Sequence, residues 1–308
     1  MAHIYVYSPS GAVRDRASFN RGIKRLQALG HEVEIDPSAL ETCQRFAGDD
    51  TTRLAAIARA AASGANVALT TRGGYGLSRL LPDLPYRQIA KSIEKGTQFV
   101  GFSDFTALQL ALYAKTQAIT WSGPALCEGF GTSDPAGPDE ITMACFDDLL
   151  SGSGEGTGWR LKANSVEAPS NGILARQATL WGGNLSMVVS LLGTPYFPEI
   201  KNGVLFLEDV AEHPYRIERM LTQLMHAGVL RQQKAIVLGQ FTEYKLTAQD
   251  KGYNLARMVE WLRTQVKCPI ITGLPFGHVP TKVLLPVGMK VDFLVEDRDA
   301  FLLWGHAH

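Results

Sequence analysis

Short apolar runs that end in glycine-bearing turns and lead into helix-periodic segments recur in the first half of this 308-residue chain. Residues 3–11 (HIYVYSPSG) predict a strand and a turn, residues 16–30 predict a helix that ends on a glycine, and residues 31–35 predict a second strand. The same order returns at residues 65–76 (ANVALTTRGGYG) and 98–112 (QFVGFSDFTALQLAL). Strands that alternate with helices in this way favour a parallel sheet, so we predict an α/β fold.

The texture of the chain changes between residues 129 and 172, where glycine, serine and proline are dense. Such a composition rarely builds a core, so it predicts a linker region that contains one short helix at residues 141–150. We therefore expect an N-terminal α/β domain at residues 1–130, a linker region at residues 131–172 and a C-terminal domain at residues 173–308. Alternating apolar positions near the C-terminus predict antiparallel strands in this smaller α/β domain.

Charge and hydropathy argue against several classes of partner. The sequence has 30 basic and 30 acidic side chains and no basic block, which argues against nucleic acid or an anionic membrane. No apolar run is long and charge-free enough to span a bilayer, and the start lacks the features of a signal peptide, so we expect a cytoplasmic protein. The four cysteines stand singly without a C-x-x-C pair, which predicts neither a disulfide framework nor a zinc site.

Ser103 lies between an apolar run that ends just before Gly101 and a helix-periodic segment. In one interpretation it caps that helix, which is the common role of serine in such a place and the favoured one from this stretch alone. In the other interpretation it stands at the tip of a sharp strand-to-helix turn as a nucleophile. The pattern departs from G-x-S-x-G because Phe105 replaces the second glycine. A nucleophile also needs a base, which another part of the chain has to supply.

Candidate partners for the serine follow two other predicted strands. Glu208 and Asp209 come directly after an apolar run, and a carboxylate there can orient a histidine, cap the helix that begins near His213, or be neutralised by an arginine. His278 follows another predicted strand, and histidine is the usual group that takes a proton from a serine hydroxyl. His213 stays open as a second candidate base. The chain order Ser103, Glu208, His278 is the order of the α/β-hydrolase triad.

Two glycine-rich loops are candidates for binding a ligand. The Arg72–Gly76 loop (RGGYG) follows a predicted strand, at the sheet edge where open α/β folds place their ligands. Its glycines let backbone N–H groups approach an anion or a developing oxyanion, although the composition also suits a flexible turn or a phosphate cradle. Neither a Walker lysine nor a full G-x-G-x-x-G accompanies the loop, which weakens the phosphate interpretation. The second loop, Trp181–Asn184 (WGGN), precedes another predicted helix.

Six sequence blocks in fixed order resemble the L,D-carboxypeptidases of the muramoyltetrapeptide carboxypeptidase family. The blocks are RGGYG, GFSDFTALQ, SGPAL, LWGGNLSMVVSLLGTPYFP, LFLEDVAEHPYRIERMLTQL and ITGLPFGH. The resemblance runs from the opening SPSG turn to Gly288, and it shifts Ser103 from a predicted cap to a predicted nucleophile. It implies that Glu208 orients His278 and that His278 is the base. It implies no metal and no cofactor.

The resemblance also implies a fold, a site and a reaction. The fold is an α/β N-terminal domain similar to class I glutamine amidotransferases, joined to a smaller C-terminal domain, in a homodimer. The backbone N–H groups of Gly74 and Asp104 would form the oxyanion hole. The reaction would release the terminal D-alanine from cytoplasmic murein tetrapeptides, with meso-diaminopimelate at position three, through an acyl-enzyme in peptidoglycan recycling. The N–H groups and side chains of the loop from Trp181 to Asn184, together with Arg72, are candidates for holding the terminal carboxylate.

Two other functions stay open. Microcin C self-immunity peptidases of the same family share the triad but cleave peptidyl or aminoacyl nucleotides, and the sequence alone shows no adenine platform either way. The other alternative is a non-catalytic muropeptide-binding protein on the same scaffold. The joint presence of Ser103, Glu208 and His278 argues against that alternative.

Overall fold

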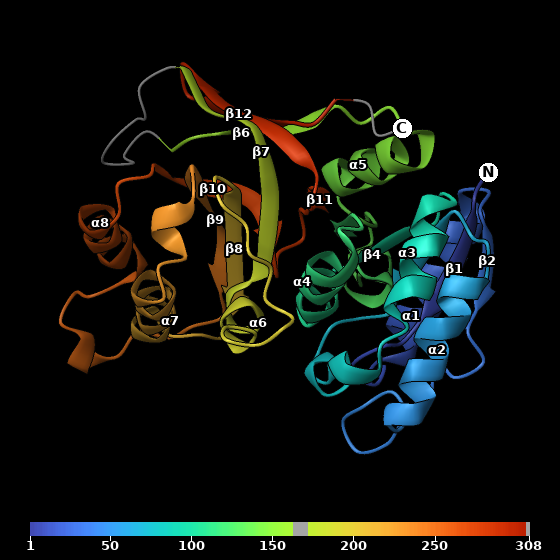
Figure 1. Cartoon of the computed structure of the whole chain (residues 1–308). Coiled ribbons are helices and arrows are strands. Elements are labelled where there is room, and N and C mark those ends of the chain that lie inside the picture. Colours follow the sequence, from blue (N-terminus) through green and yellow to red (C-terminus); the bar gives the residue numbers. More distant parts are fainter. Residues whose placement is uncertain (163–171, 306–308) are drawn as a thin grey trace.

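The computed structural model describes residues 1–162 and 172–305 of the chain. Two β-sheets with helices packed on them make up this part of the molecule (Figure 1). Residues 163–171, which belong to the predicted linker region, lie outside the described residues. None of the helices in the described ranges has both the length and the apolar character needed to cross a membrane.

The first sheet is formed almost entirely by the N-terminal half. Its strands are β1 (His3–Tyr7), β2 (Glu32–Ile35), β3 (Val67–Thr70), β4 (Gln98–Gly101), β5 (Thr120–Ser122) and β11 (Leu285–Val287). They lie in the order β11-β5-β4-β3-β1-β2; β1 to β5 pair in parallel, and β11 pairs antiparallel with β5. All residues of β3 are buried, as expected for a parallel strand with both faces covered. The predicted parallel α/β sheet is confirmed.

Five α-helices accompany the first sheet: α1 (Arg16–Ala28), α2 (Asp50–Ala62), α3 (Tyr86–Glu94), α4 (Phe105–Thr116) and α5 (Glu140–Ser151). Asp15 and Asp49 begin α1 and α2, because their carboxylates accept hydrogen bonds from N–H groups of the first helical turn. Two 3-10 turns, Leu77–Arg79 and Leu81–Asp83, precede α3. A single π-helical turn, Leu126–Phe130, follows β5.

Helix α4 lies between the two sheets (Figure 1). Every residue of α4 from Phe105 to Leu112 is buried, and most of them are apolar on all sides of the helix. Such a helix is typical of a protein interior rather than of a surface. Since Ser103 stands just before α4, burial of this helix brings the second sheet close to the serine.

The second sheet is formed by the C-terminal half and one earlier strand. Its strands are β6 (Gly156–Arg160), β7 (Gly172–Asn184), β8 (Val204–Val210), β9 (Ala235–Thr242), β10 (Ile270–Gly277), β12 (Lys290–Glu296) and β13 (Asp299–Leu303). Strands β7 to β10 pair in parallel, and β12, β13 and β6 extend the sheet as antiparallel strands. The helices of this half are α6 (Leu185–Ser190), α7 (Pro214–His226) and α8 (Leu255–Gln265). The antiparallel strands predicted near the C-terminus are confirmed.

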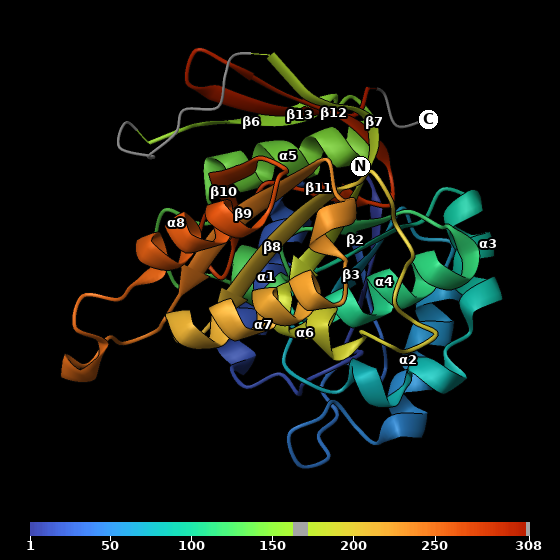
Figure 2. The same ribbon diagram turned by 60° about the vertical axis from the view of Figure 1, so that its left-hand side comes forward.

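Two strands connect the halves of the chain. Strand β6 falls within the predicted linker region yet pairs with β13, and α5, the helix expected in that region, lies next to these antiparallel strands (Figure 2). Strand β11 comes from the C-terminal half and pairs with β5 of the first sheet. The domain boundaries at residues 130 and 172, and the likeness to class I glutamine amidotransferases, stay predictions.

Substitution of Gly182 by alanine tests the close packing of β7 against β8. Gly182 has φ +131°, and a Cβ atom there would lie 1.9 Å from the carbonyl oxygen of Phe206. We expect Gly182→Ala to lower the free energy of unfolding by roughly 3 kcal/mol or more, because both the clash and the backbone strain are unfavourable. Gly64→Ala, with φ +69° and nothing within 4 Å of a Cβ, should cost only about 1 kcal/mol. Urea unfolding followed by circular dichroism measures both, and equal losses would contradict the packing argument.

Candidate active site

Ser103 occupies a tight turn between β4 and α4. Its φ is +63°, in the left-handed region that is strained for a residue with a side chain, and such strain is concentrated at functional sites. The N–H of Phe105 donates to the carbonyl of Phe102 over 3.2 Å, and the N–H of Thr106 donates to that of Ser103 over 3.0 Å. A Cβ at Gly101 would lie 2.7 Å from Thr70 Oγ1 and 2.8 Å from the Phe105 ring, so the turn requires a glycine at this position.

The RGGYG loop passes directly beside the serine. A Cβ at Gly73 would lie 2.7 Å from Ser103 Cβ and 2.9 Å from Ser103 Oγ. Gly74 has φ +117° and lies against Gly11 of the first turn of the chain. In the described part of the chain, the N–H groups of Gly74 and Asp104 donate no hydrogen bond. Both donors of the predicted oxyanion hole are therefore available to a ligand.

The Asp104 side chain ties the loops around Ser103 together. Its Oδ2 accepts a hydrogen bond from Ser10 Oγ over 2.5 Å and another from the N–H of Leu77 over 2.9 Å. Burial raises the pKa of this carboxyl group, although these hydrogen bonds act in the opposite direction. Asp104 thus holds the first turn of the chain and the end of the RGGYG loop in place around the serine.

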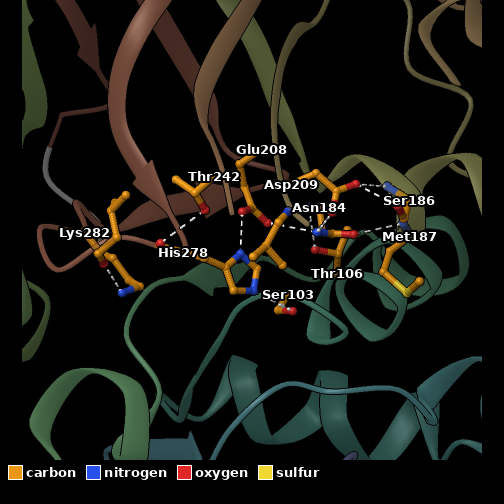
Figure 3. A network of polar contacts seen from close by, with 12 residues as sticks. Ser103, Thr106, Asn184, Ser186, Met187, Glu208, Asp209, Thr242, His278 and Lys282 are labelled. Carbon is orange, nitrogen blue, oxygen red and sulfur yellow. Dashed lines mark hydrogen bonds and ion pairs between the residues drawn. The ribbon is translucent and has the colours of Figure 1, made fainter. Parts of the chain in front are cut away.

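His278 bridges Ser103 and Glu208 (Figure 3). Its Nε2 lies 3.1 Å from Ser103 Oγ, and its Nδ1 lies 2.8 Å from Glu208 Oε2. Glu208 lies in the buried part of β8, near its carboxyl end, and His278 follows β10. The two strands flank β9, so their carboxyl ends meet at one edge of the sheet. With Glu208 ionised, Nδ1 carries the proton and donates a hydrogen bond to the carboxylate. Nε2 is then free to accept a hydrogen bond from the serine hydroxyl.

The surroundings of His278 set its proton affinity. Burial of the ring lowers the pKa, but the hydrogen bond that the ring donates to Glu208 and the charges of Glu208 and Glu128 raise it, and the net shift is upward from 6.5. The Phe102 ring packs against the imidazole with centroids 5.0 Å apart. The arrangement stabilises an imidazolium next to a serine hydroxyl, as a general base needs after it has taken the proton.

Asn184 lies behind Glu208 rather than in the open site. Its Nδ2 donates to Glu208 Oε1 over 3.2 Å and to Asp209 Oδ1 over 2.9 Å, and only 5 % of the residue is exposed. Its Oδ1 accepts from the N–H of Met187 and so caps α6, while its backbone N–H donates to Thr106 Oγ1 over 3.0 Å. Asn184 therefore positions Glu208, which differs from the substrate contact predicted for its side chain.

Asp209 has a different partner from those the sequence suggested. Its Oδ2 accepts hydrogen bonds from the N–H and the hydroxyl of Ser186, in the first turn of α6. The α7 helix is instead capped by His213 itself, whose ring accepts from the N–H of Tyr215, and Arg216 lies 3.7 Å from Glu212. Of the alternatives that the sequence left open for this pair of carboxylates, the described residues show the orientation of a histidine, by Glu208.

Trp181 and Arg72, the other two residues predicted to contact the substrate, also have partners within the protein. Trp181 is fully buried, and its Nε1 donates to Gln233 Oε1 over 2.9 Å, so its side chain is part of the core and cannot reach a ligand. This corrects the hypothesis for Trp181. Arg72 has a side chain that is 13 % exposed, and its Nη2 lies 3.6 Å from Glu128 Oε1. The Arg72 guanidinium therefore faces an acidic partner.

A cleft of about 750 Å³ opens beside His278. Its lining comes from both halves of the chain and includes Phe102, Glu128, His278 and Lys282. Glu128 belongs to the π-helical turn, a local geometry that is frequent at functional sites. Sequence reasoning missed Glu128 and Lys282; the one signal for Lys282 was its place in the same loop as His278, four residues later.

Comparison with known families identifies the scaffold. The LD-carboxypeptidase N-terminal domain model matches residues 4–123, and the LD-carboxypeptidase C-terminal domain model matches residues 177–293. The chain belongs to the LD-carboxypeptidase family. Membership makes it a serine-type carboxypeptidase, and the family predicted from the six sequence blocks is confirmed.

Individual members of the LD-carboxypeptidase family are similar over most of their length. The solved muramoyltetrapeptide carboxypeptidase of Oxalobacter formigenes superposes with a TM-score of 0.85 at 38% identity, over 98% of this chain and 98% of that one. A Bacillus subtilis protein named probable murein peptide carboxypeptidase is 27% identical over 90% of this chain and 84% of its own. The microcin C7 self-immunity protein MccF of Escherichia coli is 31% identical over 73% of this chain and 70% of its own.

The ionisation of His278 provides a test of its contact with Glu208. The carboxylate stabilises the imidazolium, so the pKa of His278 in the wild type should lie above 6.5. In Glu208→Gln the negative charge next to the ring is lost, while burial and the charges of Glu128 and Lys282 remain, so the pKa of His278 should fall below that of the wild type. Histidine ring NMR measures it without substrate, with His278→Gln to assign the resonance.

Asp209→Asn is the matched control for this titration, because it removes the same charge from the adjacent residue, which does not touch the ring. It should leave the His278 pKa closer to the wild-type value than Glu208→Gln does. A pKa unchanged in Glu208→Gln would contradict the assigned contact.

Proposed function

We propose that this LD-carboxypeptidase releases the terminal D-alanine from murein tetrapeptides, with Ser103 as nucleophile, His278 as base and Glu208 as the group that orients the base. The observation that carries the proposal is the His278 ring, hydrogen-bonded to the serine hydroxyl on one side and to a buried carboxylate on the other. The name of the similar Oxalobacter protein, a muramoyltetrapeptide carboxypeptidase, supports the substrate class.

In the proposed acylation step, His278 Nε2 takes the proton of Ser103 as Oγ attacks the carbonyl carbon of the third stem residue. Negative charge develops on the carbonyl oxygen, and the N–H groups of Gly74 and Asp104 are the donors we assign to it. His278 then gives its proton to the nitrogen of D-alanine, and the C–N bond breaks. The tripeptide stays bound to Ser103 as an ester.

In the proposed deacylation step, water replaces D-alanine in the same geometry. His278 takes a proton from the water as its oxygen attacks the ester carbonyl, and the same two N–H groups stabilise the oxyanion. The proton returns to Ser103 Oγ, and the tripeptide leaves with a new carboxyl group. Glu208 stays ionised throughout and stabilises the imidazolium in both steps.

The cellular setting of the proposal follows from the family resemblance. We assign the reaction to peptidoglycan recycling in the cytoplasm, and we infer that the enzyme is a homodimer. No step of the proposed mechanism uses a metal or a cofactor. The proposed substrate is a tetrapeptide with meso-diaminopimelate at position three.

Release of D-alanine from L-Ala-γ-D-Glu-meso-Dap-D-Ala tests the proposed function. The wild type should release it in the presence of EDTA, and Ser103→Ala should reduce kcat by roughly four to six orders of magnitude, as for loss of a triad nucleophile. Ser151→Ala, which removes an exposed hydroxyl on α5, is the matched control and should retain full activity. Tetrapeptide binding without hydrolysis by the wild type would instead support the non-catalytic muropeptide-binding protein.

The similarity to the microcin C7 self-immunity protein supports one alternative, cleavage of aminoacyl or peptidyl nucleotides by the same triad. Turnover of the tetrapeptide and of an aminoacyl sulfamoyl adenosine should be compared at equal enzyme concentration. We expect kcat/KM for the tetrapeptide to exceed that for the nucleotide conjugate by at least about tenfold, equivalent to 1.4 kcal/mol of transition-state binding. The reverse order would transfer the function to the nucleotide conjugates.

A further inference from the structure

A carboxypeptidase acts at a chain end, so its site has to accommodate the free α-carboxylate of the leaving residue. A carboxylate that leaves water for a protein cleft needs a cation or several N–H donors to replace its hydration. Among the described residues that line the cleft beside His278, two have basic side chains, Arg21 and Lys282. Arg72, whose Nη1 lies against Gly74 of the loop beside the serine, is a third cation.

Both arginines already have partners. Arg21 Nε lies 3.1 Å from the carbonyl oxygen of Gly131 and 3.2 Å from that of Thr132, and Arg21 Nη2 lies 3.6 Å from an oxygen of Asp15. Arg72 Nη2 faces Glu128 at 3.6 Å. Each guanidinium therefore has a carboxylate close by that offsets its charge.

Lys282 differs from these arginines because its charge is buried without an anion. The residue is 3 % exposed, and its Nζ donates to the carbonyl oxygen of Val279. Within residues 1–162 and 172–305, no carboxylate lies at ion-pair distance from this ammonium, which has two further protons to donate. Burial lowers the pKa of Lys282, although the more distant charges of Glu128, Glu208 and Asp139 act to raise it. A buried charge that no carboxylate contacts directly is unfavourable, and an anion bound next to it would lower that cost.

The ammonium of Lys282 lies near the reacting groups. Its Nζ is 5.2 Å from the centroid of the Phe102 ring, which packs against His278 and directly precedes Ser103. Figure 3 shows Lys282 on one side of His278 and the residues Asn184 and Asp209 on the other side. The leaving amine has to approach His278 Nε2 to receive its proton, and the carboxylate of a terminal residue is only two bonds away from that amine.

The loop that carries Lys282 is held in place by its own hydrogen bonds. The backbone N–H of Lys282 donates to Thr142 Oγ1 over 2.7 Å, and Thr281 Oγ1 donates to Asp139 Oδ2 over 2.8 Å. The N–H of Val283 donates to the carbonyl of Pro275 over 3.0 Å. These contacts fasten the loop to β10 and to the start of α5, so the cation is positioned before a ligand arrives.

We propose that the Lys282 ammonium binds the C-terminal α-carboxylate of the substrate and thereby makes the enzyme select a chain end. This inference rests on the proposed function, which supplies the leaving residue and the side of the site on which it lies. Lys282 contributes no proton to the reaction; it binds the substrate and determines specificity. It replaces Trp181 and Asn184 as the candidate for this contact.

A pair of substrates isolates the contact. One is L-Ala-γ-D-Glu-meso-Dap-D-Ala, and the other is the same peptide ending in D-alaninamide, so that both yield one tripeptide that mass spectrometry quantifies. Lys282→Met should lower kcat/KM for the free acid by roughly 10- to 100-fold, the range for one charge-assisted hydrogen bond, and leave that for the amide nearly unchanged. Lys290→Met, which removes a lysine that bonds Thr179 outside this cleft, is the control and should alter neither value.

Labelling of Ser103 by a fluorophosphonate, which does not carry a carboxylate, shows whether Lys282→Met keeps the triad intact. Labelling at the wild-type rate with a selective loss on the acid supports the inference. Equal losses of kcat/KM on both peptides would assign Lys282 a structural role and overturn the inference. A preference for the free acid that is lost in Arg72→Gln but kept in Lys282→Met would overturn it as well. A wild type that cleaves both peptides equally overturns this inference alone, whereas one that cleaves neither overturns the proposed function as well.

Discussion

The hydrogen bond between the buried Glu208 carboxylate and the His278 ring is the interaction on which the rest of the site depends. Glu208 is fully buried, so its charge is stable only where hydrogen bonds replace water, and His278 and Asn184 supply them. Through Asn184 the same network reaches Thr106 of α4. One chain of polar contacts thus joins the second sheet to the helix that follows the proposed nucleophile.

Close approach of backbone segments is the second constraint. The RGGYG loop passes so near Ser103 that a Cβ at Gly73 would overlap the serine side chain. A Cβ at Gly183, in the C-terminal half, would likewise overlap the side chain of Thr106 in the N-terminal half. Glycine allows these contacts at a conformational cost that the surrounding packing has to offset. The strained Ser103 turn persists because α4 is buried between the sheets and Asp104 holds the neighbouring loops.

Local pattern was enough for part of this description. Strands β1, β3, β4 and β8 are apolar runs followed by turn residues, and their order along the chain favours parallel pairing. Ser103, Glu208 and His278 could be named as candidates because each comes at or just after the end of a predicted strand, and the family resemblance then favoured them as the triad. Strands β6 and β11 could not be assigned to a sheet, since each pairs with a strand more than a hundred residues away. Burial of Trp181 likewise depends on distant residues such as Gln233.

The sequence by itself determined the α/β class, the family and the strand ends at which the polar residues of the site lie, because hydrophobic period and turn chemistry act between neighbours in the chain. Tertiary structure decided which of those residues meet. It brought Ser103, His278 and Glu208 into hydrogen-bond contact, turned Asn184 towards Glu208, and left the Lys282 ammonium buried without an anion. These outcomes depend on the packing of one sheet against the other around α4, and distances and solvent exposure across that contact are not encoded in any single stretch of residues.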